Sequence, residues 1–338
     1  PRTLPPETVL VSDVRNYIMP MWYLQYVDGL RPDLLGLFPL ITTKHPTLGH
    51  VFDLALSTGR PVYLIKEMPG AEIKVQVEPE GSFWRLIGPA VEGAPAHPRD
   101  LRLADAVTLS GFDRSPHSPR PGEALQVSLY WEALHPLEAD YHSFVHMLDA
   151  EGQVLAQSDQ QPGGVHYPTT LWRPGERLRD DHVLNLPHDA PAGVYRLLVG
   201  MYALSGDGEL LPLGEPVVAG QVAIKTGVQT DPGDMAHAAR GDFAGLIELL
   251  GYDVAPQEGM LAVTLHWRGL QPPDADYTVF VHLLDGSGQV VAQHDGEPQG
   301  GAYPTAIWDA GEVVVDEHLL SLPSDLPPGD YRLRVGLY

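Results

Sequence analysis

The chain has 338 residues, of which 43% are hydrophobic and 19% charged, enough for two or three domains with their own cores and too apolar for a mainly disordered protein. Its 44 acidic side chains outnumber the 21 basic ones and give a formal net charge of -23, which makes nucleic acid and anionic lipid surfaces poor partners. The absence of cysteine excludes disulfides and thiolate metal sites, and the 35 glycines and 33 prolines indicate many turns between short strands.

The first hundred residues have the pattern of an α/β unit. Residues 8–13 form an apolar run that ends in small polar residues, as buried parallel strands do. An amphipathic helix is expected next, with Pro20 in its first turn and an apolar face made of Ile18, Met19, Trp22, Tyr23, Tyr26, Val27 and Leu30. Strands at 34–40 and 61–65 flank a second helix at 48–56, and strands at 72–77 and 83–87 form a closing hairpin. This order predicts a small three-stranded parallel β-α-β domain with right-handed crossovers over residues 1–98.

An internal repeat organises the rest of the chain. Residues 131–202 align without a gap to residues 267–338, at an offset of 136 residues and with 39 identities in 72 pairs. Upstream, residues 111–113 match residues 251–253 at an offset of 140 residues. Identity of this extent at a fixed offset indicates a duplication.

Each copy has the pattern of a β-sandwich. Residues 125–131 alternate apolar and polar side chains, which predicts a strand with one face on a core. Further strands of the first copy are expected at 141–148, 154–157, 178–186, 195–202 and 217–224. Six or seven strands in about 110 residues are typical of an immunoglobulin-like or jelly-roll sandwich. We therefore expect an α/β plus all-β chain, with one sandwich over 99–226, a polar linker over 227–240 and a second sandwich over 241–338.

The two ends of the chain suggest a piece of a longer protein. The chain begins at Pro1 without a methionine or a signal peptide, and it stops at Tyr338 inside a predicted strand. The second copy has no counterpart of the strand at 217–224. We therefore expect a truncated second sandwich with an unpaired strand edge.

Asp13, Arg31 and Asp33 are the candidate polar site of the α/β unit. Asp13 follows the first strand, at the end where such sheets bind ligands. No glycine follows that strand and an acidic side chain opposes a phosphate, so helix capping explains Asp13 better than nucleotide binding. Arg31 and Asp33 clamp a ligand in one interpretation and form an ion pair in a surface turn in the other, which we favour.

A duplicated loop, Gln161–Trp172 and Glu297–Trp308, is the strongest candidate binding site. Its aromatic residues are of the kind on which sugar rings stack; in the alternative, which we favour, the tryptophans anchor the loop to the sandwich core. An aspartate before each loop is expected to hold it through hydrogen bonds to backbone N–H groups. The candidate ligand-binding residues are Tyr167, Trp172, Tyr303, Trp308, Asp159 and Asp295.

The histidines shared by both copies are His146 with His282 and His182 with His318. All four lie in predicted strands among apolar neighbours, so we expect core histidines with hydrogen-bond partners rather than metal ligands. No arrangement of nucleophile, base and acid can be assembled from the spacing of residues. We expect no catalytic residue, no metal and no cofactor.

Several motifs resemble a known family. Residues 12–13, residues 21–33 (Met-Trp-Tyr-Leu-Gln-Tyr-Val-Asp-Gly-Leu-Arg-Pro-Asp) and residues 59–63 resemble the soluble segment that follows the membrane bundle in bacterial polytopic glycosyltransferases of the protein O-mannosyltransferase-like type. The repeated patterns Phe-Val-His-x-Leu-Asp, Tyr-Pro-Thr-x-x-Trp and Pro-x-Gly-x-Tyr-Arg-Leu look like the β-sandwich modules at the C-terminal ends of such chains. The resemblance implies that the catalytic acidic residue and the lipid-phosphate-sugar site lie in a membrane portion outside this sequence.

The resulting expectation is a non-catalytic accessory region of a membrane glycosyltransferase, on the extracytoplasmic face of a bacterial membrane. Its expected partners are a glycan or polymer acceptor and the membrane-embedded domain of its own chain, with no nucleic acid. Two alternatives stay open. One is a free-standing carbohydrate-binding or adhesion protein. The other is an enzyme with a site between the α/β domain and the first sandwich.

Overall fold

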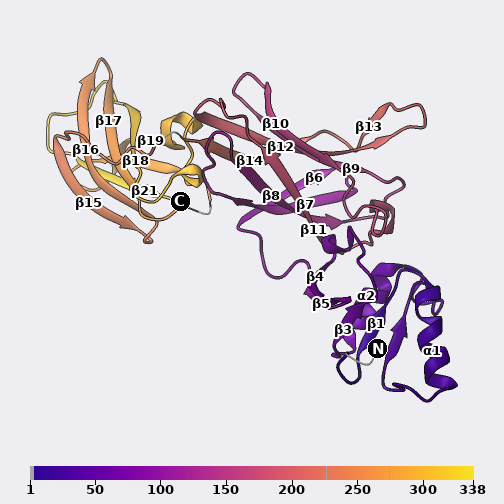
Figure 1. The fold of residues 1–338 in the computed structure, drawn as a ribbon. Helices are drawn as coiled ribbons and strands as arrows, with labels where there is room; N and C mark the ends of the chain where they lie inside the picture. The colour runs from indigo at the N-terminus through magenta and orange to yellow at the C-terminus, as the bar shows by residue number, and fades with distance from the viewer. Residues whose placement is uncertain (1–3, 226, 274) are drawn as a thin grey trace.

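The computed structural model describes residues 4–225, 227–273 and 275–338. Strands account for 45% of the structure and helices for 10%, so the β-rich composition predicted from the sequence is confirmed. Three regions follow one another in space as they do in sequence, with the N-terminal region at one end and the C-terminal region at the other (Figure 1). None of the helices in the described part of the chain is long and apolar enough to cross a membrane.

The N-terminal α/β unit contains one five-stranded sheet with the order β2-β1-β3-β5-β4. β1 pairs in parallel with β2 and β3, as the sequence predicts, and the hairpin adds β5 antiparallel to β3. The hairpin is thus part of the sheet. The elements are β1 (Val9–Val11), η1 (Arg15–Tyr17), α1 (Met19–Tyr26), β2 (Leu35–Leu37), α2 (Leu48–Ser57), β3 (Val62–Leu64), η2 (Ala71–Ile73), β4 (Val75–Glu80) and β5 (Phe83–Pro89).

The predicted apolar face of α1 is mostly wrong. Pro20 does lie in the first turn, and Ile18 is fully buried. Buried Met21 and half-buried Trp22 pack with Ile18, and Gln25 on the same side donates to the carbonyls of Arg31 and Leu34. The helix therefore buries a face that contains an amide and leaves outside five residues of the predicted stripe, which are Met19, Tyr23, Tyr26, Val27 and Leu30.

The first module consists of two sheets that enclose one core. One sheet has the order β11-β8-β7-β6, and the other contains β10-β9-β12 with both β13 and β14 paired to β12. Leu125 and Leu129 of the first sheet share a cluster with Val145 and Leu197 of the second. The strands are β6 (His97–Leu103), β7 (Val107–Ser115), β8 (Ala124–Ala133), β9 (His142–Leu148), β10 (Val154–Gln160), β11 (Arg177–Asn185), β12 (Gly193–Leu204), β13 (Leu210–Pro212) and β14 (Val217–Ile224), with η3 (Thr169–Leu171) in the long loop.

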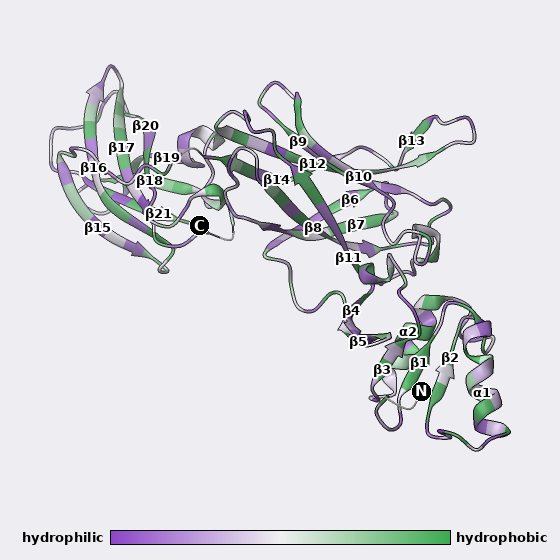
Figure 2. Cartoon of the chain, in the orientation of Figure 1, coloured by the Kyte–Doolittle hydropathy of each residue, from purple (hydrophilic) through white to green (hydrophobic). Residues whose placement is uncertain are grey.

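The second module repeats this arrangement with fewer strands. Its sheets have the orders β15-β16-β17-β20 and β19-β18-β21, and hydrophobic residues alternate with hydrophilic ones along the strands of both modules (Figure 2). Among the described residues β21 pairs only with β18. The elements are β15 (His237–Phe243), β16 (Ile247–Gln257), β17 (Met260–Gly269), β18 (Val279–Leu284), β19 (Val290–Gly296), η4 (Pro298–Gly301), η5 (Thr305–Ile307), β20 (Val313–Ser321) and β21 (Arg332–Leu337).

The predicted boundaries differ from the strands at two places. β6 begins at His97 and crosses the boundary expected after residue 98. β15 begins at His237, so the last four residues of the expected linker lie in a strand, and His237 and Ala238 pair with β16. Both strands were missed because their sequences are poor in branched apolar side chains. Residues 1–3, and the boundary expected at residue 226, lie outside the described residues.

β14 contributes to the cores of both modules. Val222 lies in the core of the first module, and Ala223 belongs to the buried cluster of the second. Val194, which pairs with Ala223 across β12 and β14, packs against the same second cluster. Adjacent residues on a strand point to opposite faces, so one strand serves two cores.

Candidate functional site

The aromatic residues predicted for ligand binding lie mainly inside the protein. Tyr167, Trp172 and Trp308 are buried, and Tyr303 is half-buried. Trp172 and Trp308 belong to the cores of the first and second modules, as the anchoring interpretation predicts. A buried ring offers no face for a sugar to stack on. Carbohydrate binding by these rings therefore finds no support in their placement.

The duplicated loop forms the junction between the α/β unit and the first module. The Tyr167 hydroxyl lies 2.8 Å from both carboxylate oxygens of Glu176 and donates to them. Lys74, which follows η2 in the α/β unit, forms an ion pair with the same carboxylate. The side chains of Lys74 and Glu176 are only 10% and 6% exposed. The ammonium charge of Lys74 in the α/β unit is thus neutralised by a buried carboxylate of the first module.

Further charges surround this first junction. Arg173 Nη2 lies 2.9 Å from Glu176 Oε1 and also pairs with Asp53 of α2, while Lys74 Nζ is 3.0 Å from Asp53 Oδ1. Burial by itself raises the pKa of Glu176, but Lys74, Arg173 and the Tyr167 hydroxyl together hold that pKa below its ordinary value. Burial and the neighbouring Glu176 carboxylate raise the pKa of Tyr167, which keeps the hydroxyl protonated as the donor.

Three glycines allow the backbone to come close at the first junction. A Cβ on Gly49, in the first turn of α2, would lie 2.2 Å from the Tyr167 hydroxyl. Gly70 has a φ of +94°, and a Cβ there would lie 1.9 Å from the carbonyl oxygen of Gly163 in the loop. Gly163 in turn has no room for a Cβ against the carbonyl of Tyr167. Larger residues at Gly49 or Gly70 would therefore force the two surfaces apart, and a larger residue at Gly163 would distort the loop itself.

A second junction, between the two modules, repeats the arrangement of a tyrosine, a glutamate that accepts its hydrogen bond, and a lysine. Tyr303 and Glu312, the counterparts of Tyr167 and Glu176, form a 2.6 Å hydrogen bond. Lys225, which directly follows β14, reaches Glu312 Oε2 at 2.6 Å and Asp309 Oδ2 at 2.9 Å. Its ammonium group lies 5.4 Å from the centroid of the Tyr303 ring, as Lys74 lies 6.0 Å from that of Tyr167. Each loop thus receives a lysine from the region before it.

Two residues of the first module complete the second junction. Arg114 of β7 donates to the carbonyl of Ala306, and burial lowers its pKa to about 10. His117 Nε2 lies 3.2 Å from the carbonyl oxygen of Trp308, and its Nδ1 lies 3.3 Å from Arg114 Nη2. Burial first, and the Arg114 charge second, lower the pKa of His117 to about 4. The neutral imidazole therefore donates through Nε2 and accepts through Nδ1.

The aspartates predicted to hold the loop have other partners. Asp159 Oδ2 lies 3.4 Å from His146 Nε2, and Asp295 Oδ1 lies 3.6 Å from His282 Nε2. Both aspartates lie in strands, β10 and β19, and each contacts a histidine of the strand paired with its own. The contacts described for these carboxylates are therefore with side chains and not with backbone N–H groups of the loop.

The polar residues of the α/β unit do not form one site. Arg31 and Asp33 form the expected ion pair at 2.9 Å, and Arg31 also donates to the carbonyls of Leu4 and Pro5. Asp13 lies at the other end of the parallel strands, roughly 20 Å away at 3.3 Å per residue. There it pairs with Lys66 at 2.9 Å and faces His166 of the duplicated loop at 3.7 Å. Asp13 thus belongs to the first junction.

The shared histidines divide into two kinds. His182 and His318 are buried and lie 3.1 Å and 2.7 Å from the carboxylates of Asp180 and Asp316, as expected of core histidines. His146 and His282 are half-buried, so the expected core position is wrong for them. No three histidine, aspartate or glutamate side chains in the described ranges are placed to hold a metal ion.

Sequence reasoning missed the residues that matter most at the junctions. Glu176 and Glu312 are identical in the two copies and follow a shared glycine, a signal that was available. Lys74 and Lys225 lie outside the aligned segments, at sequence separations of 102 and 87 residues from their partners. No local pattern connects residues that far apart.

Comparisons with known proteins add little. No family model matches the chain, and no curated protein matches it. Among solved structures it is similar to a DUF4785 family protein from Legionella pneumophila subsp. pneumophila str. Philadelphia 1, at 10% sequence identity and a TM-score of 0.20, with 69% of this chain and 48% of that chain covered. The chain thus spans about half the length of that protein. A likeness of this degree carries no argument about fold or function.

Proposed function

We propose that this chain is a non-catalytic positioning region that holds three parts in fixed orientation. The observation that supports this most directly is the junction itself, used twice: a buried lysine from one region meets a Glu–Tyr pair in the next. Interfaces between domains of one chain are usually polar and permit motion. A buried ion pair adds little net stability, but its geometry is demanding, so it favours one orientation over others.

The setting that we propose is the extracytoplasmic face of a bacterial membrane, as an accessory region of a polytopic glycosyltransferase. This part rests on the motifs in residues 12–13, 21–33 and 59–63 and on the duplicated patterns. In that setting a rigid row of domains orients a glycan, polymer acceptor or partner relative to a membrane-embedded active site. A run of hydrophobic helices encoded upstream of residue 1 is the expected finding, and a coding sequence without them contradicts the setting.

We also propose that each module is an immunoglobulin-like or jelly-roll β-sandwich. The support is that two sheets enclose one apolar core in each module, with strand neighbours repeated between the copies. A sandwich of this kind brings its loops together at its ends, where the junctions lie.

Rigidity can be measured with spin labels because the chain has no cysteine of its own. Cysteines introduced at Tyr26, 85% exposed, and at Val315, 46% exposed, place one label at each end of the molecule. Pulsed dipolar spectroscopy is expected to give a narrow distance distribution. Glu176→Gln and Glu312→Gln are each expected to broaden it, while the exposed control Glu258→Gln leaves it unchanged. A broad distribution in the unmodified chain contradicts the proposal.

Glycan binding is a second candidate function, favoured by one cavity in the second module. The cavity has a volume of about 450 Å³, and its lining includes His294, Asp295, Glu297 and His318. Its lining also includes Gly296, where the first module has Gln160, whose side chain donates to Asp180 Oδ1 at 2.7 Å. Binding on a glycan array that is lost with Glu297→Gln supports this candidate, and an array without signal contradicts it.

A further inference from the structure

A polar cavity of the second module lies where the loop after β19 begins, against β20. It has a volume of about 450 Å³, and β19, η4 and β20 all contribute to its lining. The lining residues that bear on its chemistry are His294, Asp295, Gly296, Glu297, Glu317 and His318. The counterparts of β19 and β20 in the first module are β10 and β11. The first module therefore shows the same place with a different set of side chains.

Gly296 opens the cavity. Its counterpart in the first module is Gln160, whose side chain donates to Asp180 Oδ1 at 2.7 Å. In the second module the equivalent oxygen, Asp316 Oδ1, accepts instead from the backbone N–H of Gln299 at 2.8 Å. The buried carboxylate thus keeps a donor, while the volume of one side chain is removed.

Two further differences from the first module make this place more acidic. Glu297 has a glutamine as its counterpart in the first module. Glu317 corresponds to Asp181, which pairs with Arg179 at 2.9 Å, but the counterpart of Arg179 is Val315. No lysine or arginine of the described residues lines the cavity, so the two glutamates meet no permanent positive charge within it.

A pair of hydrogen-bonded histidines adds an acceptor. His318 is 1% exposed, and its Nε2 lies 2.7 Å from Asp316 Oδ2. Its Nδ1 lies 2.8 Å from Nδ1 of His294, at the position of Ser158 in the first module. A carboxylate only accepts, so in the neutral pair His318 donates through Nε2 and accepts through Nδ1 from His294. Nε2 of His294, a residue that lines the cavity, is then an acceptor as well.

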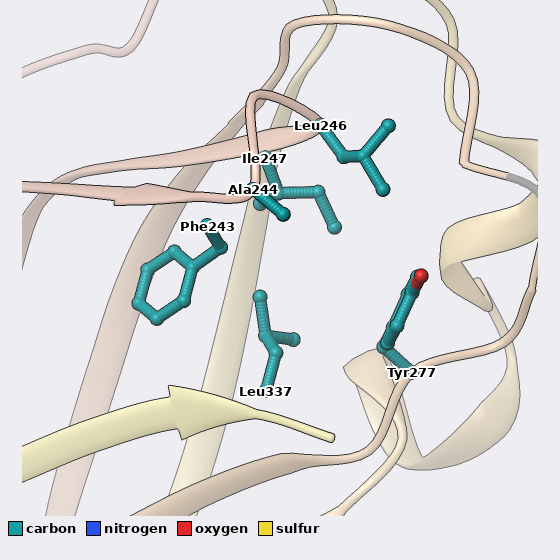
Figure 3. Close-up of a pocket in the computed structure, with 6 residues that line it drawn as sticks. All are labelled: Phe243, Ala244, Leu246, Ile247, Tyr277 and Leu337. Atoms are coloured by element: carbon teal, nitrogen blue, oxygen red, sulfur yellow. The ribbon is translucent and has the colours of Figure 1, made fainter.

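Another cavity of the same module has the opposite chemistry. It has a volume of about 190 Å³, and its lining side chains face a common space (Figure 3). None of them carries a charge; they are Phe243, Ala244, Leu246, Ile247, Tyr277 and Leu337. An acidic lining is therefore a property of the cavity beside β19 and not of the module as a whole.

The lining of the cavity beside β19 selects among classes of ligand. Its carboxylates repel phosphates and other anions. No tryptophan, tyrosine or phenylalanine of the described residues lines it, so it has no ring on which a neutral sugar stacks. A metal ion lacks the three ligands that it needs in the described part of the chain. An ammonium group has a positive charge, three donors and no acceptor, which matches a lining of carboxylates and an imidazole acceptor.

We propose that the cavity beside β19 binds the primary ammonium group of a small ligand, an amino sugar or an aliphatic polyamine. Glu297 and Glu317 supply the opposite charge, and His294 supplies a neutral acceptor. The inference deepens the glycan-binding candidate for the same cavity and rests on it only for the choice of a sugar. The positioning role of the junctions is not involved.

Calorimetric titration of the 338-residue chain compares two sugars that differ at the amino group. A β-1,4-linked trisaccharide of glucosamine, below the pKa of its amino groups, is expected to bind saturably. The N-acetylated trisaccharide has no ammonium group and is expected to bind about tenfold more weakly or not at all, because hydrogen bonds between charged groups are the stronger ones. Spermidine, titrated in parallel, tests the polyamine as the source of the ammonium group.

Variants test whether binding takes place in the cavity. Gly296→Gln restores the side chain of the first module without a change of charge and is expected to abolish binding. Glu317→Gln is expected to weaken binding about tenfold, and Val315→Arg, which supplies the cation that the first module has there, is expected to weaken it as well. The control Glu258→Gln removes the same charge from an exposed turn and leaves binding unchanged. Thermal unfolding checks that each variant is folded.

The outcomes separate this inference from the glycan-binding candidate. Equal binding of the N-acetylated trisaccharide overturns the inference and leaves the candidate standing, because charge is then not selected. Binding of spermidine without the glucosamine trisaccharide upholds the ammonium site and contradicts the candidate. Binding that Gly296→Gln and Glu317→Gln leave unchanged overturns the inference, since the overall charge of -23 then attracts the ligand. Absence of saturable binding by all three probes overturns it too.

Discussion

The two junctions share an acceptor but differ in the charges around it. Both contain a tyrosine hydroxyl bound to a glutamate and a lysine from the preceding region. Directly after the loop tryptophan, however, the first junction has Arg173 where the second has Asp309. The region opposite each loop supplies a residue of the opposite charge. α2 supplies Asp53 to Arg173, and β7 supplies Arg114, whose charge interacts with that of Asp309.

This difference shows which part of the junction tolerates change after duplication. The buried lysine, glutamate and tyrosine occur at both places, whereas the residue at the rim reverses its sign and takes its counter-charge from whichever region lies opposite. Buried charges need a partner at close range, while partly exposed ones can be balanced from several directions. Substitution of the buried glutamate is therefore expected to change stability by a similar amount at both junctions. Substitution of the surrounding residues is expected to have different effects at the two junctions.

The largest effect is expected from the tryptophans that anchor the loops. Trp172→Ala and Trp308→Ala each remove a buried indole and are expected to lower the free energy of unfolding by about 3–5 kcal/mol. Phenylalanine substitutions sharpen the comparison. Trp308 Nε1 donates to the carbonyl of Tyr303 at 3.1 Å, whereas Trp172 Nε1 has no partner among the described residues. Denaturant unfolding should therefore show a smaller loss for Trp172→Phe than for Trp308→Phe.

Removal of the acceptor carboxylate should be the next largest effect and should be similar at both junctions. Glu176→Ala and Glu312→Ala each remove the more deeply buried of the two carboxylates that pair with the lysine and leave it with one aspartate, Asp53 or Asp309, at an expected cost of about 3 kcal/mol. The double variant Lys74→Met/Glu176→Leu removes both charges and should recover most of the loss. Thermal unfolding of the full chain measures this. A double variant as unstable as Glu176→Ala alone shows that the ion pair is not what the junction needs.

A single methyl group should disturb the first junction alone. Gly49→Ala in a helix would ordinarily stabilise the protein by up to about 1 kcal/mol. Here the added Cβ meets the Tyr167 hydroxyl, so a loss of about 1–2 kcal/mol is expected instead. Gly206→Ala, with nothing within 4 Å of the added Cβ, is the control. A stabilising effect of Gly49→Ala means that α2 does not press against the loop as described.

Mild acid should loosen the second junction before the first. The pKa of His117 is about 4 in the folded protein and about 6.5 in an unfolded chain, so the unfolded state binds more protons between these values. The contribution of neutral His117 to the free energy of unfolding is complete above pH 6.5 and is lost as the pH falls toward 4. Glu176, whose pKa is lowered on folding, keeps its contribution until the pH falls below about 4.3.

Hydrogen exchange at pH 5.5 and 7.5 tests this order. Residues 303–312 are expected to lose more protection at the lower pH than residues 167–176. His117→Gln should remove the difference, because its amide does not gain a proton in this range. Equal loss of protection in the two loops contradicts the assignment.

The strands were predictable because their signals are local. Residues 125–131 alternate in polarity, and the predicted strand corresponds to β8. The junctions were not predictable in this way, since Lys74 and Lys225 resemble any surface lysine in sequence. Exposure on α1 was also missed, because Tyr23 and Tyr26 have the spacing of a buried face and only the packing of Met21 shows which side turns inward. Local patterns thus predicted the strands, whereas the contacts between regions could be identified only in the three-dimensional structure.

β14 sets a constraint on how the two modules can be separated or spaced. Val222 and Ala223 are neighbours in the chain but belong to different cores. Insertion of one residue into this strand would exchange the faces of every residue after it, whereas two residues would restore them. An insertion within β14 that keeps both cores intact must therefore add residues in steps of two, about 6.6 Å of strand. A chain cut after Ile224 would also leave the second core without a residue that it uses.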